Sequence, residues 1–243
     1  MEPQKMPQYY QKLVPLNKDL HAEMTVSPGP DGFRFTASSQ TVLLAHAEFF
    51  DAGRHFPIIF IPTPTNSFVP VALLGLEPNE NLFVDAEGSW TAQYVPAYIR
   101  RYPFITADVD NDRLAICFDE TFPGFKQEGG TPLFIDGEAS PKLQEIQTFL
   151  QDYAVQMKQT EQFGTMLAQS GLLRQMDAQA NLSDGRSFPL NGLLVVDEQK
   201  LQQLPDADVV GLFRSGLMAV IQAHLMSLRN LNGLIDRKVR LSL

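Results

Sequence analysis

Cysteine, basic residues and long apolar runs are all scarce in this sequence of 243 residues. Because Cys117 is the single cysteine, neither an intrachain disulfide nor a cysteine zinc cluster can form. Lysine and arginine number 19 against 28 aspartates and glutamates, a balance that disfavours nucleic acid and anionic membrane surfaces as partners. The most apolar stretches, residues 68–76 and 209–226, are too short or too polar to span a membrane. The first residues lack the apolar segment of a secretory signal, so we expect a cytoplasmic protein.

Recognised catalytic motifs are also missing. The sequence contains no nucleophile elbow, Walker loop or dinucleotide-binding glycine fingerprint. His46 and Glu48, with a distant histidine, formally match the ligand pattern of non-haem iron enzymes. However, residues 39–51 are predicted to form a helix, on which residues two apart point about 200° away from each other. We therefore predict no catalytic residue, metal or cofactor, and keep as an alternative a metal-dependent or modifying enzyme that uses His46, Glu48 or His55.

The pattern of apolar residues predicts an α+β protein. We expect a mixed or mostly antiparallel sheet from residues 57–136, covered by the 39–51 helix and by the two long helices of a helical C-terminal half. Five prolines in residues 1–32 predict an extended N-terminal arm. Residues 33–243 then form a single α+β domain, which is sheet-rich over 33–138 and helix-rich over 139–243.

Short apolar runs bounded by turn residues give the predicted strands. Pro70 indicates that its strand is at an edge or contains a bulge, because a central strand would need the missing N–H. Cys117, followed by two acidic residues, is interpreted as a buried structural cysteine. Residues 181–191 are predicted to be a loop. The predicted strands are residues 32–36, 58–61, 68–76, 82–84, 113–118, 133–135 and 193–196.

Helix signals are strongest after residue 139. Ser140 and Pro141 suit the cap and first position of a long helix, which Gly171 is expected to end. A short helix follows over 197–204. The last helix is predicted from residue 206 or 208 to residues 232–233, and His224 lies on its apolar face, which predicts a hydrogen-bonded core histidine.

Residues 81–104 combine aromatic, proline and arginine residues more densely than any other stretch. The stretch contains the only tryptophan and three of the six tyrosines. Pro96 and Pro103 together favour a short helix from Pro96 to Arg101, because Pro103 disfavours helical backbone at Tyr102. On this helix Arg100 and Arg101 diverge by about 100°, so that at most one faces the body of the protein. The candidate binding residues are Trp90, Tyr94, Tyr98, Arg100, Arg101 and Tyr102.

Two interpretations of this stretch are open. In the first, an arginine pairs with Asp85, Glu87 or Asp108, and the aromatic rings fill a corner of the core. In the second, aromatic walls and a guanidinium hold a carboxylate, a peptide end or a loop of a partner.

Several segments carry a family resemblance. Phe56-Pro57-Ile58, ALLGL, ENLFVD, Gly88, Trp90 and YVPAYIRRYPF, with the later LLVVDEQKLQQL and AHLMSLRNL, resemble the SapC-like family of bacterial proteins over about residues 13–231. Members are named after a gene of a bacterial surface-layer region. The resemblance implies neighbouring genes for tryptophan-halogenase-like flavoproteins, cupin-like oxygenases and TonB-dependent receptors, but no particular activity or catalytic residue. A peptide-transporter permease shares the name, and the lack of a predicted membrane span excludes it.

These observations favour a non-catalytic binding or accessory protein. Its expected partners are a protein, a peptide or a small carboxylate ligand, and the resemblance adds halogenase-like or cupin-like enzymes. The alternatives are the enzyme considered above and a structural protein of the cell surface, associated with the surface layer.

Overall fold

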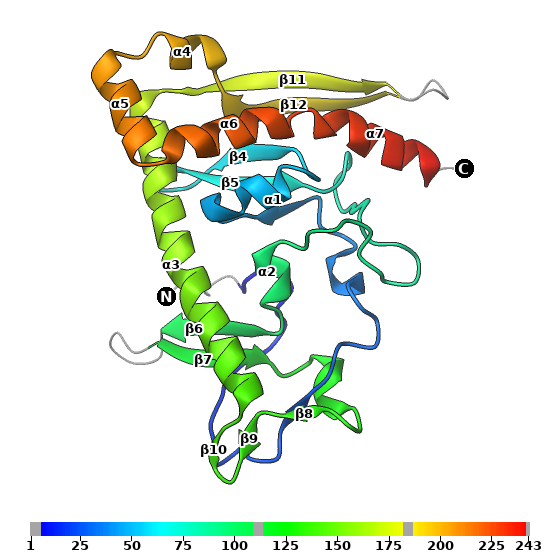
Figure 1. Ribbon diagram of the computed structural model, residues 1–243. Helices are drawn as coiled ribbons and strands as arrows, with labels where there is room; N and C mark the ends of the chain where they lie inside the picture. Colours follow the sequence, from blue (N-terminus) through cyan, green and yellow to red (C-terminus); the bar gives the residue numbers. More distant parts are fainter. Residues whose placement is uncertain (1–5, 109–113, 182–186, 242–243) are drawn as a thin grey trace.

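The computed structural model describes residues 6–108, 114–181 and 187–241 (Figure 1). It is an α+β structure of antiparallel sheets and helices, as predicted. Strands predicted within residues 57–136 are divided among three sheets rather than forming one. Residues 58–61 and 68–76 contribute to a five-stranded sheet, residues 113–118 to a three-stranded sheet and residues 133–135 to a two-stranded pair. Among the described helices, none is by itself long and apolar enough to cross a membrane, and the one pair that would suffice together is bent by 89°.

The larger sheet has five antiparallel strands in the order β11-β12-β4-β5-β3. Its apolar strands β4 and β5 lie inside the sheet, and seven of their eleven residues are buried, whereas Ile61 and Pro62 at the end of β4 are exposed. The strands are β3 (Thr41–Leu43), β4 (Ile58–Pro62), β5 (Phe68–Leu73), β11 (Leu173–Asn181) and β12 (Ser187–Val196).

The smaller sheet has three strands in the order β1-β7-β6, and the predicted strand 113–118 forms its central strand β7 (Leu114–Asp119). Its neighbours are β1 (Leu13–Pro15) and β6 (Phe104–Asp108). Two short pairs lie beside it, β2 (Thr25–Val26) with β8 (Thr131–Pro132) and β9 (Phe134–Ile135) with β10 (Glu138–Ala139). The segment predicted to be an extended arm therefore contributes β1 and β2 to these sheets.

The long helix α3 (Pro141–Ser170) passes alongside both sheets (Figure 1). Its ends are those predicted: the Ser140 Oγ accepts from the Leu143 N–H at 3.2 Å, and Gly171 has a φ of 61°. Leu150 packs into the core of the smaller sheet and Phe163 into that of the larger one. A single helix thus holds the two cores together.

The C-terminal helices are α4 (Glu198–Gln202), α5 (Asp206–Arg214), α6 (Leu217–Ser227) and α7 (Asn230–Arg240). The prediction of one continuous last helix was wrong. Gly216, with a φ of 79°, separates α5 from α6, and α7 continues through residues 232–233. The buried His224 Nε2 accepts from the Val196 N–H at 3.0 Å, which confirms the predicted core histidine.

Four local predictions need correction. Residues 39–51 are not one helix: β3 pairs with β5, and only η2 (His46–Glu48) and α1 (Phe49–Ala52) are helical, because the β-branched pair Thr41-Val42 fits the sheet edge. Residues 32–36 contain the 3-10 turn η1 (Arg34–Thr36) instead of a strand. Residues 82–84 form only the isolated bridge Val84–Trp90. The described part of the predicted loop 181–191 belongs to the hairpin β11–β12, while residues 182–186 lie outside the described residues.

Pro70 also departs from its prediction, since β5 is an internal strand. The Leu44 N–H donates to the Pro70 carbonyl at 3.1 Å, so the nitrogen of Pro70 faces the same side, toward β3. Strand β3 ends at Leu43, one residue before the position opposite Pro70. An internal strand accepts proline where its neighbour has already ended.

Candidate functional site

The candidate site is built around α2 (Ala97–Arg100) in the densest aromatic stretch. Pro96 precedes the helix with extended backbone, and the Arg101 N–H donates to the Ala97 carbonyl at 3.0 Å. The helix is therefore the short one predicted from the two prolines. Arg100 is exposed, whereas Arg101 turns toward the body of the protein.

Trp90 has a structural position. Its indole Nε1–H donates to the Tyr94 carbonyl at 2.7 Å, and its ring packs against Phe33, Phe56 and Phe83 at centroid distances of about 6 Å. These contacts fix the loop that leads into α2.

Tyr94 binds a buried carboxylate. Its hydroxyl donates to Glu48 Oε1 at 2.7 Å, and the Ala97 N–H donates to the same oxygen at 2.7 Å. The other oxygen, Oε2, accepts from the Ala45 N–H at 2.8 Å. Burial, and then the Glu48 charge, raise the pKa of Tyr94. Glu48 thereby ties the η2 turn to the start of α2.

Arg101 lies among tyrosine rings. Its guanidinium carbon is 3.9 Å from the ring centre of Tyr98, 5.1 Å from that of Tyr153 and 5.7 Å from that of Tyr10. Within the described residues the guanidinium makes no ion pair, and its buried Nε has no hydrogen-bond partner. Cation-π contacts therefore hold this side chain.

In the first interpretation of this stretch, an arginine pairs with Asp85, Glu87 or Asp108. Neither Asp85 nor Glu87 forms such an ion pair with any arginine that the structure describes. The Asp85 carboxylate instead accepts from the Glu87 and Ser89 N–H groups of its own turn. The side chain of Asp108 lies outside the described part of the structure. The aromatic part of that interpretation fits Trp90, Tyr94 and Tyr98, which pack against or within the core.

Arg100 and Tyr102, in contrast, face a hollow of about 540 Å³. This hollow, called the α2 hollow below, lies between α2, the first turn of α3 and the segments around β2 and η1. Tyr102 forms part of its aromatic wall: its ring is stacked on Phe35 at 4.4 Å and meets the edge of Phe122 at 5.4 Å. The lining residues are Val26, Ser27, Pro28, Gly29, Gly32, Phe33, Phe35, Ile99, Arg100, Tyr102, Pro103, Phe104, Phe122, Thr131, Lys142 and Ile146.

The charges of the α2 hollow have one sign. Among its lining residues, the charged side chains are Arg100 and Lys142, and neither an aspartate nor a glutamate is present. The Arg100 Nε–H donates to the Val95 carbonyl at 2.9 Å, and its guanidinium carbon lies 5.2 Å from the Phe149 ring centre. Lys142 pairs at 3.1 Å with Glu145, a carboxylate that is largely exposed to solvent. The residues that line the hollow thus carry two positive charges and no negative charge, in a chain of net charge −9.

The residues considered for the alternative, metal-dependent enzyme, His46, Glu48 and His55, do not form a metal site. Glu48 is occupied by the three donors described above, and the His46 Nδ1 lies 3.1 Å from the Thr160 Oγ1. Burial lowers the pKa of both His46 and His55. The part of the chain that the structure describes holds no cluster of three or more residues able to bind a metal.

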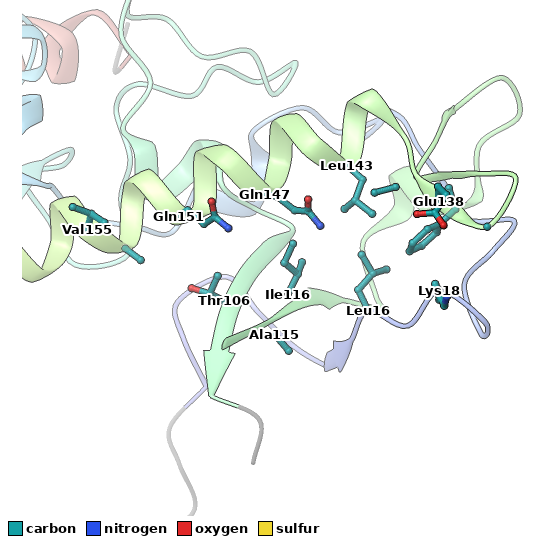
Figure 2. A pocket seen from close by; sticks show the side chains of 14 residues that line it. Leu16, Lys18, Thr106, Ala115, Ile116, Glu138, Leu143, Gln147, Gln151 and Val155 are labelled. Atoms are coloured by element: carbon teal, nitrogen blue, oxygen red, sulfur yellow. The ribbon is translucent and has the colours of Figure 1, made fainter. Parts of the chain in front are cut away.

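A second hollow lies on the other side of α3, above the smaller sheet (Figure 2). This α3 groove measures about 740 Å³ and is lined by Leu16, Lys18, Thr106, Ala115, Ile116, Phe134, Gly137, Glu138, Ala139, Leu143, Gln147, Gln151, Ala154 and Val155. None of these residues was predicted to be functional. Leu143, Gln147 and Gln151 are spaced by four residues and therefore lie along one side of the helix. Because Leu143 is apolar, this spacing could have indicated that the two glutamine amides also face the body of the protein.

This chain is thus an α+β protein in which a long helix joins two antiparallel sheets and two hollows lie beside that helix. The chain belongs to the SapC family, whose family model matches residues 16–234. Comparison with curated proteins and with solved structures gives no match.

Proposed function

We propose that this SapC-family protein binds a ligand in which a carboxylate adjoins an apolar or aromatic group, and that it does so in the α2 hollow. The proposal rests on one observation: Arg100 and Lys142 line the hollow together with aromatic side chains, and its described lining residues include no aspartate or glutamate. Guanidinium and ammonium groups form charge-assisted hydrogen bonds with carboxylates. The rings of Phe33, Phe35 and Phe122 supply apolar surface for the rest of the ligand.

The size of the α2 hollow supports a small ligand or the end of a peptide. Its volume of about 540 Å³ lies within the range of about 300 to 1,000 Å³ that is usual for ligand sites. An entire protein domain would be too large for it. A C-terminal residue, or an acidic loop of a partner protein, would fit.

The chemistry of the lining favours binding over catalysis. The α2 hollow presents no histidine, cysteine or carboxylate among its described lining residues. Burial and the nearby Asp119 raise the pKa of Tyr102 to about 12, so its hydroxyl stays protonated near neutral pH. General acid–base catalysis requires a group that exchanges protons near the working pH. We therefore propose a binding or accessory role, in which halogenase-like or cupin-like enzymes are candidate partners.

Two related probes test the proposal. N-acetyl-L-phenylalanine carries an aromatic ring and a carboxylate, and N-acetyl-L-phenylalaninamide is its neutral copy. We expect the acid to bind at least tenfold more tightly by calorimetry, since a hydrogen bond to a charged group contributes about 1.5 to 3 kcal/mol. The double variant Arg100→Ala/Lys142→Ala should remove this difference.

The matched control is the double variant Arg214→Ala/Lys158→Ala, which removes one arginine and one lysine from exposed helical positions outside the hollow. It should bind the acid as the parent does. Equal affinity of the parent for the acid and the amide, or full acid binding by Arg100→Ala/Lys142→Ala, would contradict the proposal.

A further inference from the structure

The α3 groove has an apolar floor and a partly polar wall. Thr106, Ile116 and Leu16 come from β6, β7 and the end of β1, and they form a row across the smaller sheet. The wall is the side of α3 from Leu143 to Val155 (Figure 2). The twelve helical steps from Leu143 to Val155 correspond to a length of about 18 Å. The groove is therefore elongated along α3, and it crosses the strands.

Two side-chain amides project into this groove. Figure 2 shows Gln147 and Gln151 directed from α3 toward the strands that carry Thr106 and Ile116. Neither amide forms a hydrogen bond with any other described residue, although each offers two N–H donors and one oxygen acceptor. Exposed glutamines on a helix are usually solvated, but these two share one side and face an apolar floor.

The spacing of the two amides matches that of an extended peptide. Residues four apart on a helix are about 6 Å apart along its axis. In an extended strand, main-chain groups that point to the same side repeat every two residues, or about 6.6 Å. Gln147 and Gln151 can therefore bond to two successive main-chain groups on one side of a strand. About five extended residues span the length of the groove.

The charges that line the groove indicate which peptide side chains it can accept. The two charged lining residues, Lys18 and Glu138, have opposite signs and lie together at the end near β10, while the rest of the lining is uncharged. A charged peptide side chain would lose its hydration there without gaining a partner. The floor of Leu16 and Ile116 instead favours small or branched apolar side chains at alternate positions.

We propose that the α3 groove binds an extended, uncharged peptide segment of about five residues through its main chain. The segment lies along α3, its main-chain amides bond to Gln147 and Gln151, and every second side chain contacts the floor. This site is separate from the α2 hollow, because the buried side chains of Phe104, Phe118 and Leu150 pack together between α3 and the sheet. The inference consequently stands independently of the proposed function.

The capped pentapeptide acetyl-Val-Ser-Val-Ser-Val-amide is a suitable probe. NMR of the labelled full chain should show shifts of the Gln147 and Gln151 side-chain NH₂ signals on titration. The variant Gln147→Leu/Gln151→Leu keeps the groove apolar but removes both amides, and we expect at least a tenfold loss of affinity. The control Gln159→Leu/Gln162→Leu alters two exposed glutamines on α3 outside the groove and should bind as the parent does.

Two N-methylated copies of the probe separate main-chain recognition from hydrophobic binding. One is methylated at residues 2 and 4, the other at residues 1, 3 and 5. Because alternate N–H groups of a strand point to the same side, one copy should lose binding and the other should keep it. The proposal is overturned by a pentapeptide that does not bind, by equal binding to Gln147→Leu/Gln151→Leu, or by shifts that lie outside the groove.

Discussion

The hydroxyl of Tyr94 donates a hydrogen bond of 2.7 Å to the Glu48 carboxylate, which is buried with an exposed fraction of 7%. The two residues come from segments that were predicted separately, a helix and an aromatic stretch. Their contact positions α2, and α2 in turn presents Arg100 to the α2 hollow. The geometry of the candidate site therefore depends on a buried carboxylate that does not line it.

The first prediction concerns this pair. In Glu48→Gln, one oxygen can still accept from Tyr94 and Ala97, but the new NH₂ faces the Ala45 N–H and two donors oppose each other. We expect a loss of about 2 kcal/mol in the free energy of unfolding. Urea denaturation of Glu48→Gln, Tyr94→Phe and the double variant measures the coupling, which should be about 0.5 kcal/mol or more. Strictly additive effects would show that the contact does not stabilise the fold, and exposed Glu161→Gln is the control.

The second prediction concerns Asp119, which anchors the N-terminal segment. Its carboxylate accepts from the Gln11 and Lys12 N–H groups and from Thr121. Burial by itself would raise the pKa of Asp119, but these hydrogen bonds outweigh it and lower the pKa. The stability from Asp119 is therefore present above about pH 4, the pKa of an unfolded aspartate, and is lost below it.

Asp119→Asn should release the segment, because an amide NH₂ would oppose one of the donors. We expect faster hydrogen exchange of the Gln11 and Lys12 amides and earlier proteolysis in that segment. Asp152→Asn, at an exposed position of α3, is the control. Unchanged exchange at both amides would rule out the anchoring role.

The long elements could be predicted from the sequence because their signals are local. Ser140, Pro141 and Gly171 mark both ends of α3 without any tertiary information. The strand β3 could not be separated from a helix, since its three residues become a strand only by pairing with β5. Strand β11 is a polar edge strand without alternation, so no pattern distinguished it from a loop.

For the same reason, only part of the candidate site could be predicted from the sequence. Arg100 and Tyr102 lie in the aromatic stretch, and their short helix follows from two prolines. Lys142 comes from the first turn of α3, and the facing ring of Phe33 comes from the N-terminal segment. Only the packing of distant segments brings these side chains together.

The third prediction is a pH dependence caused by His224. Burial lowers the pKa of His224 to about 4, against about 6.5 in an unfolded chain. The folded state then binds fewer protons, so this stability is complete above pH 6.5 and falls as the pH drops toward 4. At about 1.4 kcal/mol per pKa unit, we expect a loss of about 2 kcal/mol between pH 7 and pH 5.

The variant His224→Gln separates the pH dependence caused by His224 from that caused by the other histidines. In His224→Gln, the side-chain oxygen can accept from the Val196 N–H as the Nε2 does, but it does not titrate. Urea denaturation at pH 7 and pH 5 should show a smaller difference in the variant than in the parent. An identical pH dependence in both proteins would show that His224 is not the cause.

The fourth prediction concerns the contact between α3 and the larger sheet. A Cβ atom at Gly164 would lie 1.8 Å from the carbonyl oxygen of Phe68, so the helix can approach β5 only without a side chain there. Gly164→Ala should push the helix away and lower the free energy of unfolding by about 1 to 3 kcal/mol. Gly211, within α5, is the matched control because a Cβ there meets no atom within 4 Å. Gly211→Ala should be neutral or stabilise by up to about 1 kcal/mol. If both substitutions stabilised the protein, the close approach of α3 to β5 would be wrong.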